Sequence, residues 1–107
     1  MEMILGLTVD RLAALAQPHR LAVFRLLVVA GPAGRAAGES ADAIGLPASS
    51  LSFHLAHLKR VGLVKVERQG RSLRYAADFA VMRDVVGFLT DNCCGGEDCA
   101  APARNAA

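Results

Sequence analysis

The three cysteines of this chain all lie within its last fifteen residues, at Cys93, Cys94 and Cys99. The 92 residues before them contain no cysteine, so these thiols are not scattered small apolar side chains. Gly95-Gly96 permits the tight chain reversal that would bring Cys99 back onto the adjacent pair. Because thiolates select soft ions, the cluster predicts one binding site for a small thiophilic ion.

The donors in this segment favour a trivalent metalloid. Zinc prefers four ligands and commonly combines thiolate with imidazole. The segment offers three sulfurs, no histidine, and only Glu97 and Asp98 as hard donors. Trivalent arsenic and antimony take three sulfurs in a pyramid, with a lone pair in the fourth direction. We therefore predict that the three cysteines bind As(III), and also Sb(III), and that the protein has no organic cofactor.

Other interpretations of the cysteines stay open. The site could hold zinc, cadmium or lead instead, or a methylated arsenic species that needs only two of the thiols. The thiols could also form a thiol–disulfide switch, or have no specific role. Arsenite affinity in the absence of cysteine oxidation would separate a sensor from a redox-responsive or non-sensing protein.

Charge and composition narrow the class of protein. The 107 residues suggest one domain, and a hydrophobic content of 53% suggests apolar surface beyond a single core. Residues 49–75 carry a net charge of +5 whereas the rest carries −3, which indicates a polyanion partner. No stretch has the length of a membrane span and no signal-peptide pattern is present, so a cytoplasmic protein with reduced thiols is expected.

The hydrophobic periodicity predicts a helix-turn-helix unit. Helices are expected at 9–17, 18–30, 37–44 and 48–61, and the apolar helix 18–30 should be the buried central one. Gly45-Leu46-Pro47 forms the tight turn between the third and fourth helices. On the fourth helix, Leu51, Leu55 and Leu58 define the buried stripe.

The opposite arc of that helix is predicted to enter the major groove of DNA. Small serines at its start allow close approach to the bases, and Phe53 is an aromatic residue in the middle of the polar arc, where it could contact a thymine methyl group. The predicted DNA-binding residues of this helix are Ser49, Ser50, Ser52, Phe53, His54, His57 and Arg60. His54 and His57 are also spaced like a metal pair, but this position favours groove or packing roles.

A basic β-hairpin follows directly. Strands are expected from 63 or 64 to 68 and from 71 to 76, joined by Gln69-Gly70. Arg68 and Arg71 lie at its tip and Arg74 further along, so all three are predicted to contact DNA. The expected fold class is therefore mostly α with a small two-stranded wing, a winged helix-turn-helix. No Ser/His/Asp arrangement, carboxylate pair or phosphate loop predicts an enzyme.

The last helix, 79–89, is apolar over about half its circumference, although a single core needs only about 100°. A second copy would cover the surplus, and a twofold dimer suits palindromic half-sites. The predicted interface comprises Leu12, Leu15, Met82, Val85, Val86 and Leu89. We expect residues 1–92 to form the DNA-binding and dimerisation domain and residues 93–107 a flexible tail that holds the ion-binding cysteines.

Three stretches together resemble the ArsR/SmtB family of metal-responsive winged-helix repressors: Leu15-Ala16-Gln17-Pro18-His19-Arg20-Leu21, residues 50–59 and Gly62-Leu63-Val64. The resemblance implies a homodimer that represses a double-stranded palindromic operator and releases it when an ion binds. Residues 36–42 lack the cysteines that many arsenic-responsive members carry before the recognition helix. The cysteines after the last helix look instead like the relocated site of the Acidithiobacillus type.

Overall fold

The computed structural model describes residues 2–97, which form five α-helices, three β-strands and one short 3-10 turn. In chain order the elements are α1 (Glu2–Leu15), α2 (Pro18–Ala30), β1 (Arg35–Ala36), α3 (Ala37–Ile44), α4 (Ala48–Arg60), β2 (Val64–Gln69), β3 (Ser72–Ala77), α5 (Phe79–Thr90) and η1 (Cys93–Gly96). This confirms the predicted winged helix-turn-helix fold. Cys99 and the rest of the predicted tail beyond residue 97 lie outside the described residues.

The core forms where α2, α4 and the start of β2 meet. Leu27, Leu55 and Leu58 are almost completely buried there, and Leu63 joins them at the exit from α4. The predicted stripe of leucines on α4 is therefore confirmed, and α2 is the central helix. Burial of a leucine side chain contributes about 1.5–3 kcal/mol, so this stripe fixes which face of α4 is left outside.

Local sequence signals set the helix boundaries. Pro18 is the first residue of α2, and the side chain of Gln17 accepts a hydrogen bond of 2.8 Å from the Arg20 amide. Gly45 ends α3 in the left-handed region at φ 80°, which a residue without Cβ adopts at little cost. Asp78 caps α5 by accepting from the Val81 amide.

The sheet has three strands in the order β1-β3-β2, all antiparallel, so the expectation of a two-stranded hairpin was incomplete. β1 contributes only two residues, Arg35 and Ala36, opposite Tyr75 and Arg74. The loop before it approaches β3 so closely that a Cβ at Gly34 would collide with the Tyr75 carbonyl. This close contact depends on the tertiary fold and leaves no periodic signal in the sequence.

The β2–β3 hairpin, which we call the wing, differs by one residue from its predicted register. Gln69 pairs with Ser72, so the turn consists of Gly70 and Arg71 and not of Gln69 and Gly70. Gly70 has a φ of 63°, the conformation that favours glycine at this point of a two-residue loop. Arg71 therefore lies in the turn itself.

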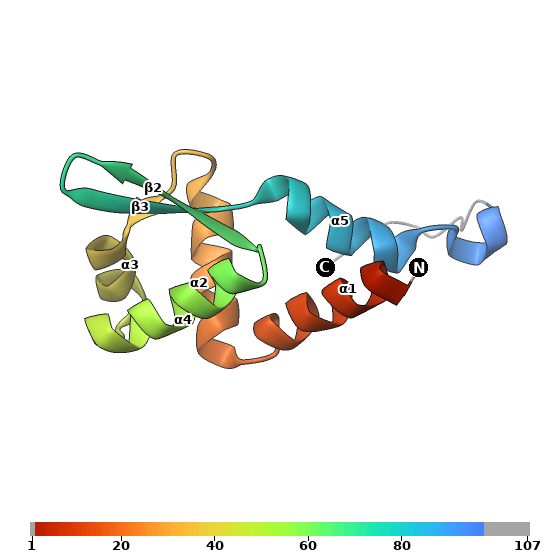
Figure 1. The fold of residues 1–107 in the computed structure, drawn as a ribbon, viewed down its shortest axis with the longest axis horizontal. Helices are drawn as coiled ribbons and strands as arrows, with labels where there is room; N and C mark the ends of the chain where they lie inside the picture. Colours follow the sequence, from red (N-terminus) through yellow and green to blue (C-terminus); the bar gives the residue numbers. More distant parts are fainter. Residues whose placement is uncertain (1, 98–107) are drawn as a thin grey trace.

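Helix α1 begins at Glu2, seven residues before the predicted start at Val9. It lies beside α5, and the two helices extend away from the wing as an arm (Figure 1). Within residues 2–97 no single helix is long and apolar enough to cross a membrane; α1 and α2 would meet that requirement only as a pair, which is bent by 100°.

Candidate functional site

The face of α4 opposite the leucine stripe is open to solvent. Ser49, Ser52 and Arg60 are exposed, and Phe53 has 68% of its surface accessible, which is unusual for an aromatic side chain. Ser50 is half-buried at the edge of this face. The last turn of α4 holds His57, Lys59 and Arg60, and the first turn holds no acidic residue. The exposed face of α4 therefore carries small side chains at its start, an aromatic side chain in its middle and basic side chains at its end.

The two histidines of α4, His54 and His57, are half-buried, unlike the exposed residues of this face. The ring centroid of His54 lies 5.7 Å from that of His19 on α2 and 5.8 Å from that of Phe53. Its Nδ1 atom is buried without a hydrogen-bond partner in the described part of the chain. Contact of His54 with DNA stays a prediction; in the structure its ring packs against those of His19 and Phe53. No group of three His, Cys, Asp or Glu side chains that could hold a metal occurs among residues 2–97.

Both histidines favour the neutral form. Burial lowers the pKa of His54, and the positive charge of Arg20 and then His19 lower it further. Burial also lowers the pKa of His57, followed by the charges of Arg20 and Arg60 and by His54. The two imidazole rings therefore take up protons at a lower pH than a histidine in solution does.

A first prediction concerns pH and stability. The unfolded chain takes up protons near the ordinary histidine pKa of 6.5, whereas folded His54 and His57 take them up only at lower pH. Protonation therefore favours the unfolded chain, and the free energy of unfolding should fall as the pH drops below about 6.5. Thermal unfolding at pH values from about 7.5 to 5 measures this fall. His54→Gln should weaken this dependence of stability on pH. An equal loss in Tm on acidification for the wild-type protein and for His54→Gln would contradict the assignment of the effect to His54.

The three arginines of the wing are not equivalent. Arg68 and Arg71 are exposed at or beside the turn, as predicted for the wing tip. Arg74 is half-buried, and its guanidinium donates hydrogen bonds to the carbonyl oxygens of Ala33 at 3.2 Å and Gly34 at 3.0 Å. Arg74 thus fixes the loop before β1 to the wing, and its contact with DNA remains a prediction.

Two of the three predicted thiols lie together at the far end of the arm. The Sγ atoms of Cys93 and Cys94 are 3.7 Å apart and both residues are exposed. The chain reaches this position through left-handed conformations at Asn92, with φ 57°, and Cys94, with φ 58°. Gly95 continues the same turn with φ 67°. Binding of an ion by this pair stays a prediction, and the predicted return of its third ligand, Cys99, onto the pair falls outside the described residues.

The arm carries a large exposed apolar surface. Val86 is 54% and Leu89 61% exposed on α5, and Leu12 on α1 is exposed as well. Val85, by contrast, is only 6% exposed within the single chain, and its place in the dimer interface stays a prediction. Leu15 and Met82 pack partly against the core of their own subunit.

Further apolar side chains on α1 were not among the predicted interface residues, most of them because residues 2–8 were not expected to be helical. The exposed ones are Met3, Ile4, Leu5, Leu7 and Val9. The apolar run at the start of the chain was the available signal. Placed on a helix, it extends the exposed surface of the arm along most of α1.

The chain is similar to known regulators over most of its length. Residues 15–67 match the family described as a helix-turn-helix domain. The HTH-type transcriptional regulator YgaV of Escherichia coli (strain K12) is 30% identical over 83 residues, which cover 78% of this chain and 82% of the relative.

Solved structures agree with this similarity. The ArsR-like transcriptional regulator from Rhodococcus sp. RHA1 superposes with a TM-score of 0.70 at 26% identity, over 78% of this chain and 76% of that one. The homodimeric winged helix-turn-helix DNA-binding domain of Mb0332 from Mycobacterium bovis, a possible ArsR-family regulator, gives a TM-score of 0.67 at 26% identity over 94% and 93%. This chain belongs to the ArsR family of winged helix-turn-helix transcriptional regulators.

Proposed function

We propose that this regulator is an arsenic-responsive repressor: a homodimer that binds a palindromic operator without inducer and releases it when As(III) binds Cys93, Cys94 and Cys99. The observation that supports it most is the pair of exposed thiols, 3.7 Å apart, at the end of the arm whose apolar face suits a second copy. Sb(III) has the same preference for three sulfurs and should act in the same way.

The DNA-binding part of this proposal rests on the exposed face of α4 and on the wing. Ser49, Ser52 and Phe53 would contact base edges in the major groove, while Arg68 and Arg71 would bind the backbone beside it. The basic charge of residues 49–75 gives this surface the sign that DNA requires. A twofold dimer then presents two copies of α4 to half-sites about one helical turn apart.

The dimer itself is proposed from the arm. A contiguous exposed apolar surface is a typical site of protein association, and α1 and α5 carry most of the large exposed apolar residues of the described chain. The structural relative Mb0332 is described as homodimeric. The same face of this chain would bury Leu89 and Val86 against the equivalent helices of a second copy.

The metalloid chemistry requires no further reactant. Arsenous acid reacts with three thiols: three As–O bonds break, three As–S bonds form, and each hydroxyl group leaves with a thiol proton as water. The resulting As(III) knot would join the segment after α5 to the end of the arm and alter how the two arms pack. About 100-fold weaker operator binding needs a coupling free energy of only about 2.7 kcal/mol.

Fluorescence anisotropy tests the proposal directly. A palindromic duplex enriched from a random library by the reduced protein is titrated with and without arsenite, in a thiol-free reductant. Sulfur-to-arsenic charge-transfer absorbance is followed in the same samples. We expect three sulfurs per ion and about 100-fold weaker binding at saturation. Release by peroxide but not by arsenite would favour a redox switch, and release by zinc or cadmium alone would favour a divalent sensor.

The wing gives a separate prediction. Arg68→Gln and Arg71→Gln should weaken binding to every duplex by similar factors, because these side chains are proposed to bind phosphates. The slope of log affinity against log salt concentration should decrease by about one for each phosphate that a variant no longer binds. Phe53→Leu is the comparison variant, expected to change sequence preference with an unchanged slope. An unchanged slope for both arginine variants would exclude the wing from the interface.

A further inference from the structure

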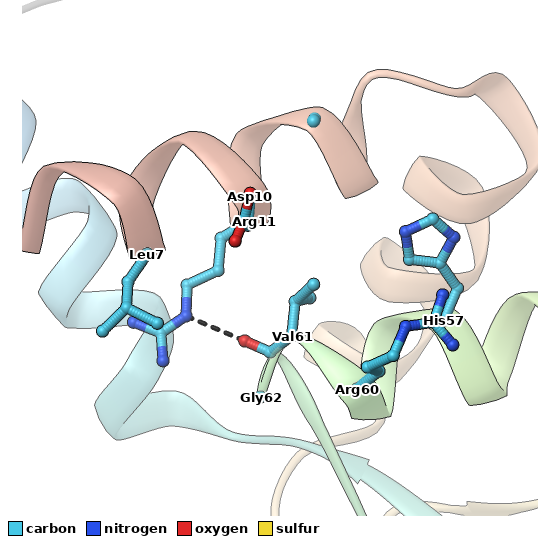
Figure 2. Close-up of a pocket in the computed structure, with 8 residues that line it drawn as sticks. Leu7, Asp10, Arg11, His57, Arg60, Val61 and Gly62 are labelled. Carbon is cyan, nitrogen blue, oxygen red and sulfur yellow. Dashed lines mark hydrogen bonds between the residues drawn. The ribbon is translucent and has the colours of Figure 1, made fainter. Parts of the chain in front are cut away.

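A long side chain joins α1 of the arm to the end of α4, the recognition helix proposed to enter the major groove. The Nε atom of Arg11 on α1 donates a hydrogen bond of 2.9 Å to the carbonyl oxygen of Val61, fifty residues further along the chain (Figure 2). Val61 is the C-terminal cap of α4. Within residues 2–97 this is the one side-chain hydrogen bond that joins α1 to the end of α4.

The end of α4 is built to receive a cation. The Gly62 amide bonds to the Lys59 carbonyl and the Leu63 amide to the Leu58 carbonyl, so the turn closes the helix on its own backbone. Gly62 has a φ of 86°, and a Cβ there would lie 3.3 Å from the Arg11 guanidinium. The guanidinium therefore passes directly over this turn, at the negative end of the helix dipole.

An open cavity of about 510 Å³ lies beside Arg11, with Asp10 on the α1 side and His57 and Arg60 on the α4 side (Figure 2). On the side of this cavity no packed side chains from residues 2–97 supplement the Arg11 hydrogen bond, whereas Ala14, further along α1, is buried in the core. The Ala14 carbonyl, three residues after Arg11, accepts a hydrogen bond of 2.7 Å from the Nε atom of Arg20, which holds this end of α1 on α2.

We infer that Arg11 is a positioning residue that fixes the angle of the recognition helix relative to the dimer arm. This inference rests on the proposed function. In a dimer the arms set the relation between the two subunits, so the angle of each α4 to its own arm sets the separation of the two recognition helices. Operator binding needs that separation to match the half-sites, whereas non-specific binding to phosphates does not.

The test compares Arg11→Met with Arg25→Met, which removes the same charge from an exposed position on α2. Affinities are measured for the enriched palindromic duplex and for a random-sequence duplex of equal length at one salt concentration. For Arg11→Met we expect about tenfold weaker binding to the palindrome and less than about twofold change for the random duplex. Arg25→Met should leave the ratio of the two affinities unchanged. Arg11→Lys should retain part of the preference for the palindrome that Arg11→Met loses.

Amide hydrogen exchange of the free protein supplies a readout independent of DNA. The amides of Gly62 and Leu63 should exchange faster in Arg11→Met than in the unmodified protein, with those of Leu27 and Leu55 unchanged. Wild-type affinity ratio and exchange rates in Arg11→Met would overturn the inference. A wild-type protein that enriches no sequence would instead contradict the proposed function. If Arg11→Met does not fold, an affinity ratio for Arg11→Lys equal to that of the wild type and no faster exchange at Gly62 would likewise overturn the role of Arg11.

Discussion

Replacing Cys93 and Cys94 together by serine is expected to abolish the release of DNA by arsenite while leaving operator binding without inducer unchanged. Serine keeps the size of the side chain but removes the soft sulfur donor, and Cys99 alone cannot supply the three As–S bonds. The expected loss is the whole inducer effect, about 100-fold in affinity or about 2.7 kcal/mol of coupling. Anisotropy of the labelled palindrome at increasing arsenite concentration measures it.

Glu97→Gln is the matched control for this experiment. Glu97 lies next to the same turn and, among residues 2–97, is the one hard donor that follows the thiols in sequence. If sulfur alone binds the metalloid, removal of this carboxylate should leave the arsenite response unchanged. Cys99→Ser should abolish the response to arsenite but keep any response to a methylated arsenic that needs two thiols. Undiminished release by arsenite from the double serine variant would mean that the site lies elsewhere.

The second large effect is expected from Leu89→Asp in the arm. Leu89 is 61% exposed in the single chain, and its burial in a dimer would leave the new carboxylate desolvated and without a partner. We expect the protein to become a folded monomer, and its affinity for the palindrome to fall by about 100-fold or more because one subunit binds only one half-site. Sedimentation equilibrium and anisotropy on the same sample measure the two changes.

Val29→Asp controls for the cost of placing a carboxylate on a helix. Val29 is 74% exposed near the end of α2, away from the arm, just as Leu89 lies near the end of α5. This variant should stay dimeric and keep its affinity for the palindrome. A dimeric Leu89→Asp protein with unchanged DNA binding would show that the subunits associate through another surface.

The elements with clear boundary signals could be predicted from the sequence. Pro18 marks the start of α2 and Gly45 the end of α3, and both helices have their predicted bounds. The stripe Leu51, Leu55 and Leu58 identified the buried side of α4, and hence its exposed side, because helical periodicity alone decides both.

Features that depend on tertiary contacts could not be predicted in this way. β1 is two residues long and exists because it pairs with β3. The roles of Arg74 and Arg11 rest on hydrogen bonds to backbone carbonyls that are 40 and 50 residues away in the chain. Val85 lies on the apolar arc of α5, but a helical wheel cannot tell which part of that arc its own subunit covers.

The location of the thiol pair has a consequence for kinetics. η1 lies beyond the end of α5, at the opposite extremity of the molecule from the wing tip (Figure 1). A duplex bound by α4 and the wing would leave Cys93 and Cys94 uncovered, so in the proposed function arsenite would reach the repressor while it is still on its operator. The onset of transcription would then be set by how fast the metalloid reacts with the thiols, and not by the residence time of the repressor on DNA.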